Sequence, residues 1–189
     1  KKILIIKKNK KVINLGMLSR IEKYKGQEDL IKSIELLKKE DRKKFHVIFI
    51  GRGEKNHLKN IKSYIAQKKL KKYFTFKNYI HKDSVSILKN FDIFLSLTRD
   101  FEGFGYSIAE AMLSKIPIIS TNVGGTKEFL NKKNSNIVKP RSPENIKELL
   151  KDYLKNKNQW LEKAKYASKY ISRKHNSEIM GTKFKKVFI

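Results

Sequence analysis

The sequence contains no cysteine, only three prolines and one tryptophan among its 189 residues. Without cysteine, the chain can form neither a disulfide framework nor a thiolate metal site. No apolar run approaches the about 20 residues that a helix needs to cross a bilayer, and no signal-peptide pattern is present. The chain begins with Lys1 rather than methionine. The first residue alone leaves open whether the natural protein extends before Lys1. The length suits one domain, or one domain with a tail, and is sufficient for a core of its own.

Acidic residues are scarce, since 45 lysines and arginines face 18 aspartates and glutamates, giving a net charge of +27. Such a charge suits an anionic partner, such as nucleic acid, a membrane surface or a phosphorylated substrate. However, 39 of the basic residues are lysine and only six are arginine. Nucleic-acid readers depend on arginine for bidentate and stacked contacts. We therefore ascribe most of the charge to an AT-rich coding bias, from which some attraction to an anionic membrane would still follow.

Short apolar runs alternate with amphipathic segments along the chain. Strands are predicted at residues 12–16, 45–50, 73–76, 92–97, 116–120 and 136–138. Helices are predicted at residues 26–39, 54–68, 83–90, 106–114 and 126–130, and from Pro143, with Ser142 as its N-cap, into a helical tail. This alternation predicts the α/β class, with a doubly wound, Rossmann-like parallel sheet of about six strands.

In such a sheet, ligands bind beyond the carboxyl ends of the strands, where the strand order reverses. The loop after the first strand runs from Gly16 to Gly26 and carries Arg20 and Lys25 just before a helix. A planar guanidinium, an ammonium group and the free N–H groups of a helix start together suit a pyrophosphate. In so basic a chain, two cations five residues apart are weak evidence by themselves.

The loop after the strand at 92–97 holds Glu102 and Glu110 around the turn Gly103-Phe104-Gly105. Glycine allows the backbone to approach a ligand closely, and the helix that follows directs free N–H groups toward it. Glu110 falls about a turn and a half into this helix, where its carboxylate can accept hydrogen bonds from two hydroxyl groups of a ribose. Isolated glutamates are usually solvated, but these interrupt an apolar, glycine-rich stretch of a lysine-dominated chain. We therefore favour a functional role.

The loop after the strand at 116–120 contains Gly124 and Gly125 before a short helix. These paired glycines offer backbone donors to an anion. An ordinary connection between strand and helix explains them equally well, so the sequence leaves both interpretations open.

Together these loops resemble the C-terminal domain of retaining glycosyltransferases of family 4, which have the two-domain GT-B architecture. The resemblance covers roughly residues 12–188 and its segments occur in the family's order. It is carried by Arg20-x4-Lys25-Gly26, Gly51-Arg52-Gly53, Glu102-Gly103-Phe104-Gly105-x4-Glu110-Ala111-Met112, Pro117-Ile118-Ile119-Ser120-Thr121 and Val123-Gly124-Gly125-x2-Glu128.

The resemblance implies a role for each matching position. Arg20 and Lys25 would neutralise the diphosphate of a UDP-, GDP- or ADP-sugar donor without a metal ion or other cofactor. Glu110 would hold the ribose, and Glu102 would act at the donor sugar as the catalytic, positioning carboxylate. The other expected substrate-binding residues are Gly16, Gly103, Phe104, Gly105, Tyr106 and Ser107, with Tyr79 and Ile80 beside the base.

The resemblance also implies a domain plan. Residues 1–11 would be a linker or the edge of a missing N-terminal Rossmann domain, 12–173 the nucleotide-sugar-binding domain, and 174–189 a helix packing toward the missing domain. We expect the chain to bind donor weakly and not to transfer sugar alone. A glycan or lipid-linked acceptor, polysaccharide biosynthesis and a cytoplasmic location, peripheral at the inner membrane face, are the corresponding expectations.

Two alternatives remain. One is a nucleotide-binding domain that has lost catalysis, against which the presence of both Glu102 and Glu110 argues. The other is a basic nucleic-acid-binding module, which would gather cations and aromatic residues on one face. The lysines instead spread over every segment, and no helix-turn-helix or stacking platform is evident.

Overall fold

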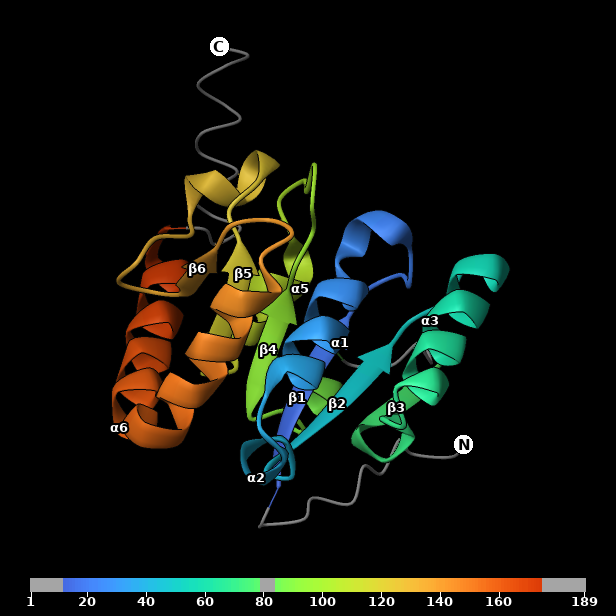
Figure 1. Ribbon diagram of the computed structural model, residues 1–189. Coiled ribbons are helices and arrows are strands. Elements are labelled where there is room, and N and C mark those ends of the chain that lie inside the picture. Colours follow the sequence, from blue (N-terminus) through green and yellow to red (C-terminus); the bar gives the residue numbers. More distant parts are fainter. Residues whose placement is uncertain (1–11, 79–83, 175–189) are drawn as a thin grey trace.

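The computed structural model describes residues 12–78 and 84–174, which form one parallel six-stranded sheet in the order β3-β2-β1-β4-β5-β6 (Figure 1). The strands are β1 (Ile13–Leu18), β2 (Phe45–Ile50), β3 (Phe74–Lys77), β4 (Ile93–Ser96), β5 (Ile118–Thr121) and β6 (Asn136–Val138). The α-helices are α1 (Gln27–Leu36), α2 (Lys39–Arg42), α3 (Lys55–Gln67), α4 (Ser84–Leu88), α5 (Tyr106–Leu113) and α6 (Pro143–Lys174), and short 3-10 helices are η1 (Lys23–Lys25), η2 (Lys71–Tyr73) and η3 (Gly124–Glu128). The predicted doubly wound α/β fold is confirmed.

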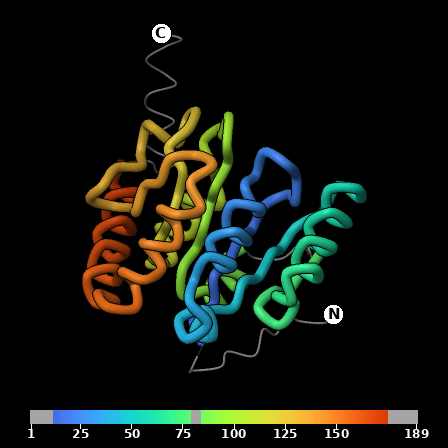
Figure 2. Tube along the Cα trace, viewed as in Figure 1, coloured from blue at the N-terminus to red at the C-terminus, as the bar shows by residue number. Residues whose placement is uncertain are grey.

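Helices cover both faces of the sheet, with α1 and α3 in front and α5 behind in the views of Figures 1 and 2. Alternate residues of β2 enter different cores: Val47 and Phe49 face the cluster under α1 and α3, whereas Ile48 and Ile50 face the cluster under α4 and α5. This period of two, with both faces apolar, is the pattern of a doubly covered parallel strand. Burying each such side chain contributes about 1.5–3 kcal/mol.

Helix α6 packs against both α1 and α5 because it bends at Asn156, whose φ of −120° and ψ of 32° are not helical. The Asp152 carboxylate accepts hydrogen bonds of 2.7 Å from both Asn156 Nδ2 and Trp160 Nε1. The bond from Trp160 is the largest cause of a lowered pKa of Asp152. Trp160 also packs edge-on against Tyr153 at 5.2 Å between ring centroids. These contacts fix the bend that carries α6 around the β6 edge of the sheet.

The helix predicted at residues 26–39 is wrong in its extent, because the chain breaks there into α1 and α2. Leu37 is buried in an extended conformation, with φ −67° and ψ 143°. Arg42 returns to the end of α1, where its Nε donates to the Ile34 carbonyl at 2.8 Å and its Nη2 to the Leu37 carbonyl at 2.7 Å. The orphan carbonyls of α1 are thus satisfied by a side chain, which hydrophobic spacing does not reveal.

Smaller boundaries also differ. The first strand runs two residues further than predicted, to Leu18, and β5 begins at Ile118, directly after Pro117. The helix predicted at residues 126–130 is the 3-10 helix η3. The Ser142 hydroxyl, predicted as an N-cap, donates to the Pro140 carbonyl at 3.4 Å. The predicted linker at 1–11 and the end of the predicted helix at 174–189, beyond residue 174, lie outside the described residues.

Candidate functional site

Three loops meet at the carboxyl ends of the adjacent strands β1, β4 and β5, where the strand order reverses between β1 and β4. We call residues 19–26 the cation loop, 97–105 the glutamate loop and 122–125 the glycine turn. In the order of the sheet the glutamate loop lies between the other two. This is the edge at which a doubly wound sheet binds its ligand.

Glu102 is where the cation loop and the glutamate loop meet. Its Oε2 atom accepts a 2.7 Å hydrogen bond and ion pair from Lys25 Nζ and a 2.8 Å hydrogen bond from Thr98 Oγ1. The side chains of Lys25 and Glu102 are 12% and 21% exposed, so the pair is largely shielded from water. The structure therefore brings together two residues that the sequence predicts for one site.

Tyr24 contacts two cations of the cation loop, Arg20 and Lys25. The Arg20 guanidinium donates to the Tyr24 hydroxyl and lies 5.7 Å from its ring centroid, while Lys25 Nζ lies 5.1 Å from the same centroid. Arg20 also pairs with Glu22 at 3.0 Å, and its side chain is 64% exposed. A hydrogen bond to Glu22 is the largest cause of the raised pKa of Tyr24. Both predicted diphosphate cations thus share one aromatic neighbour, with Arg20 at the surface and Lys25 deeper.

Close backbone packing fixes the ends of the cation loop. Gly26 has a φ of +75°, and a β-carbon there would lie 2.1 Å from the Leu97 carbonyl oxygen. A β-carbon on Gly51 would lie 1.8 Å from the Ser19 carbonyl oxygen. Gln27, at the start of α1, donates to the Arg20 carbonyl at 2.8 Å and to Ser19 Oγ at 3.3 Å. The loop is therefore held at both ends before any ligand is present.

The turn of the glutamate loop opens toward the surface at Gly103, where an added β-carbon would meet no atom within 4 Å. Gly105, with φ +71°, begins α5, and its carbonyl accepts from Ile108 and Ala109. The backbone N–H groups of Tyr106 and Ser107 find no acceptor within the described residues. These two donors are available to an anion.

The predicted aromatic residues of this turn have different surroundings. The Phe104 ring lies 5.0 Å from that of Phe129 and packs against the core under α5, so only its backbone faces the turn. The side chain of Tyr106 is 70% exposed.

Glu110 is half-buried one turn and a half into α5. Its carboxylate makes no hydrogen bond or ion pair with any part of the chain that the structure describes. Unlike Glu102, it is an uncommitted acceptor, which is what binding two ligand hydroxyl groups requires.

The glycine turn packs against the glutamate loop. The Gly125 N–H donates to the Glu102 carbonyl at 2.9 Å. A β-carbon on Gly124, whose φ is +58°, would lie 2.1 Å from that carbonyl oxygen, and one on Gly125 would lie 2.8 Å from the Gly103 carbonyl oxygen. Of the two interpretations that the sequence leaves open, the structure favours a packing role, because the Gly125 donor is already occupied.

Three predicted residues are not placed with the others. Gly16 lies inside β1, where a β-carbon would sit 2.1 Å from the Phe91 ring, so this glycine makes room for core packing rather than for a ligand. Tyr79 and Ile80 lie outside the described residues. Conversely, hydrophobic spacing missed Gln27, Thr98 and Arg99, which hold the loops together. A signal that sequence reasoning could have used is the presence of Gln27 and Asp29, two polar residues, among the apolar positions on the buried face of α1.

Within residues 12–78 and 84–174, no group of three or more histidine, aspartate or glutamate side chains could hold a metal ion. None of the helices described is long and apolar enough to span a membrane.

The sheet order and the loops at the switch point define a doubly wound α/β domain whose ligand-binding edge lies at the carboxyl ends of β1, β4 and β5. Residues 1–174 match the family model described as "Glycosyl transferases group 1", and the chain belongs to that family. An uncharacterized glycosyltransferase of Methanocaldococcus jannaschii is 28% identical over 186 residues, which are 97% of this chain and 47% of the relative.

Solved structures share the fold. HepE of Anabaena, in complex with UDP and glucose, matches with a TM-score of 0.85 at 18% identity, over 94% of this chain and 48% of HepE. The C-terminal domain of the group 1 glycosyltransferase LpcC from Francisella tularensis matches with a TM-score of 0.77 at 26% identity, over 89% of this chain and 90% of that domain. The chain thus spans about half the length of the M. jannaschii relative and of HepE.

Proposed function

We propose that this chain is the donor-binding half of a retaining glycosyltransferase of the family 4 type. The observation that carries the proposal is the Lys25–Glu102 pair at the switch point, beside the uncommitted Glu110. HepE, which has the same fold, was solved with UDP and with UDP-glucose, which supports a nucleoside-diphosphate sugar as donor. The LpcC domain, an isolated unit of similar extent, supports a half that folds by itself.

In the proposed mechanism, Arg20, Lys25 and the free N–H groups at the start of α5 bind the diphosphate. They stabilise the negative charge that grows on it as its bond to the anomeric carbon breaks, in place of a metal ion. The acceptor hydroxyl forms the new bond on the same face of the sugar, and its proton is released with the nucleoside diphosphate. Glu102 Oε2 is occupied by Lys25 and Thr98, so Oε1 is the oxygen left to position the donor sugar. Glu110 binds the ribose.

Isothermal titration of the 189-residue chain with UDP, GDP and ADP, and with the free nucleosides, tests donor binding. We expect one diphosphate to bind with much higher affinity than its nucleoside. Its affinity should be the same in EDTA as in Mg²⁺. The proposal fails if no nucleotide binds while mixed oligonucleotides bind tightly at physiological salt.

Turnover of a donor by this chain alone, above a Glu102→Ala control, would contradict its dependence on an N-terminal domain. Turnover that persists after Glu102→Ala would indicate a non-catalytic role for Glu102. Transfer to a glycan or lipid-linked acceptor requires the longer protein.

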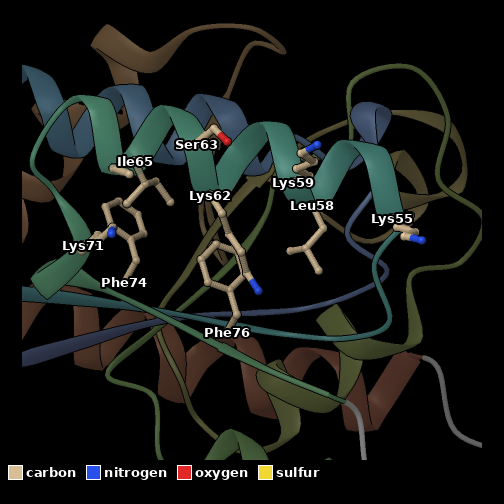
Figure 3. A pocket seen from close by; sticks show the side chains of 10 residues that line it. Lys55, Leu58, Lys59, Lys62, Ser63, Ile65, Lys71, Phe74 and Phe76 are labelled. Atoms are coloured by element: carbon tan, nitrogen blue, oxygen red, sulfur yellow. The ribbon is translucent and has the colours of Figure 1, made fainter.

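A second part of the proposal is peripheral contact with an anionic membrane, favoured by a groove of about 680 Å³ between α3 and the edge strand β3. Its floor is apolar, with Leu58, Phe74 and Phe76, and none of the described residues that line it carries a carboxylate (Figure 3). Four lysines line it as well: Lys55, Lys59, Lys62 and Lys71. A basic rim over an apolar floor complements the phosphates and upper acyl chains of anionic phospholipids.

Co-sedimentation with vesicles of phosphatidylcholine, with and without phosphatidylglycerol, tests this contact. We expect binding only to the anionic vesicles. Because each lysine near such a surface contributes about 1 kcal/mol, Lys59→Gln with Lys62→Gln should weaken binding about 30-fold. The matched control is Lys155→Gln with Lys157→Gln on the exposed side of α6, which changes the net charge equally. Equal losses from both pairs would show attraction by general charge and contradict a role for the groove, as would preference for oligonucleotides over vesicles.

A further inference from the structure

Arg99 forms a second link between the cation loop and the glutamate loop, besides the Lys25–Glu102 pair. It belongs to the glutamate loop, one residue after Thr98 and three before Glu102, yet its side chain reaches the neighbouring cation loop. That side chain is only 10% exposed. A buried guanidinium is stable only with several well-placed acceptors.

The acceptors of Arg99 all come from the segment around Lys25. Its Nε and Nη2 atoms donate to the two carboxylate oxygens of Asp29 at 3.0 and 2.7 Å, which is the bidentate geometry of arginine with a carboxylate. Nη2 also pairs with Glu28 at 2.9 Å, and Nη1 donates to the Lys23 carbonyl at 3.1 Å. The Arg99 backbone N–H donates to the Tyr24 carbonyl at 2.7 Å.

These bonds lie on both sides of Lys25 in the sequence. Lys23 and Tyr24 are bound before it, Glu28 and Asp29 after it, and Gly26 is pressed against the Leu97 backbone between them. The neighbouring Thr98 donates to Glu102. Residues 97–99 therefore set the separation between the Lys25 ammonium and the Glu102 carboxylate, although Arg99 touches neither group.

The position of Asp29 supports the same conclusion. It is an acidic residue on the buried face of α1, 4% exposed, and the bidentate bond to Arg99 is the partner that the structure gives it. The hydrogen bonds to Asp29 raise the pKa of Arg99. An ion pair so buried requires both partners, because removing one leaves the other charged and desolvated.

We propose that Arg99 is a positioning residue of the donor site, which acts by holding the cation loop so that Lys25 faces the donor diphosphate. This inference rests on the proposed donor function. Arg99 itself would not contact the ligand. It would nevertheless affect the affinity for the diphosphate, separately from any effect on the stability of the fold.

Arg99→Lys is the decisive variant, because lysine keeps the charge but cannot make the bidentate bond and reach the Lys23 carbonyl together. We expect the dissociation constant for UDP, or for whichever diphosphate the wild-type chain prefers, to rise about 10-fold or more, as for the loss of a charged hydrogen bond. Nucleoside binding should change less than about twofold, since only the diphosphate contact is displaced. Glu28→Gln, which weakens one contact and keeps Asp29, should have a smaller effect in the same direction.

A second measurement does not depend on nucleotide binding. Limited acetylation followed by mass spectrometry reports the accessibility of the Lys25 amine, which is 12% exposed in its pair with Glu102. Released from its position, Lys25 should react several-fold faster in Arg99→Lys, whereas other lysines should not. Arg141→Lys is the matched control, because Arg141 pairs at the surface with Asp100, in the same glutamate loop. It should leave both readouts unchanged.

The outcomes separate the two proposals. A folded Arg99→Lys chain with wild-type diphosphate affinity and wild-type Lys25 reactivity would overturn the inference, as would equal losses of diphosphate and nucleoside binding. If the wild-type chain binds no nucleotide, the proposed function fails and Lys25 reactivity alone decides whether Arg99 positions the loop. A lower melting temperature with both site readouts unchanged would leave Arg99 a structural residue only and likewise contradict the proposal.

Discussion

The cation loop and the glutamate loop face each other across the Lys25–Glu102 pair but are held in different ways. Close backbone packing fixes the ends of the cation loop at Gly26 and Gly51, and the side chains of Gln27 and Arg99 bind the backbone carbonyls between them. The turn of the glutamate loop is held by backbone packing, through the close approach of Gly124 to the Glu102 carbonyl. One wall of the site therefore depends on polar and charged side chains in addition to close packing, whereas the other depends mainly on the absence of side chains.

The largest expected effect is on the backbone-held wall. Gly124→Ala would place a β-carbon 2.1 Å from the Glu102 carbonyl oxygen at a φ of +58°. Backbone strain and overpacking together should lower the free energy of unfolding by about 2–5 kcal/mol. Urea denaturation measures this change. Gly103→Ala is the control, because its β-carbon meets no atom within 4 Å and should cost less than about 1 kcal/mol. Equal losses would mean that close packing does not shape this wall.

On the charge-held wall, Lys25→Ala should act on the ligand more than on the fold. Loss of one charged hydrogen bond to a diphosphate should weaken UDP binding about 10- to 100-fold and leave uridine binding nearly unchanged. Calorimetric titration with both ligands checks the prediction. The control is Lys23→Ala. The side chain of Lys23 is exposed, and this residue contributes to the network only through its backbone carbonyl, which the substitution keeps. A comparable loss in the control would contradict a specific role for Lys25.

Glu110 lies outside both loops and should affect both ligands alike. Because it is proposed to bind the ribose, Glu110→Ala should weaken UDP and uridine binding equally, about 5- to 10-fold. It should weaken the binding of 2′-deoxyuridine less than that of uridine, because this ligand keeps only one of the two hydroxyl groups that Glu110 is proposed to bind. The surface variant Glu162→Ala serves as control, since that side chain is 70% exposed on α6. A loss confined to UDP would place Glu110 at the phosphates instead.

The smallest expected effect lies away from the site. Burial lowers the pKa of His46, which shares a 2.8 Å hydrogen bond with Thr75 on the neighbouring strand. The unfolded chain therefore takes up a proton near pH 6.5 more readily than the folded chain. The contribution of neutral His46 to the free energy of unfolding is thus fully present above that pH and decreases as the pH falls below it. Urea midpoints at pH 7.5 and pH 5.5 should show a smaller decrease in His46→Gln than in wild type. Nucleotide affinity at pH 7.5 should be identical in the two proteins.

Much of the fold follows from the sequence, because each strand is a short apolar run and each helix carries its own apolar spacing. The break after α1 does not, since it depends on Arg42 reaching back to the carbonyls of Ile34 and Leu37. Local patterns of hydrophobicity report which face is buried and contain no information about such returning side chains.

The candidate site was predictable to the same degree. The sequence indicates Lys25 and Glu102 as one site, but Gly16 is explained by Phe91, a contact across 75 residues that no local pattern contains. No local pattern indicates Arg99 either, because its partner Asp29 lies 70 residues away in the sequence. A compositional cue existed: in a chain with 39 lysines and six arginines, both Arg42 and Arg99 use the arginine fork to reach several acceptors at once. At Arg42 and Arg99, lysine would not reach the same set of acceptors.

The Lys25–Glu102 contact joins residues 77 positions apart in the chain. A nascent polypeptide that has been synthesised only as far as β3 already carries Lys25, but its partner Glu102 arrives only after β4 has been made and has inserted beside β1. The proposed nucleotide affinity would thus be a property of the completed sheet rather than of any segment. A ligand that binds only this state also protects it, by an amount that grows with the logarithm of ligand concentration. In a cell, the supply of activated sugar would therefore also help to determine how much of this protein escapes proteolysis.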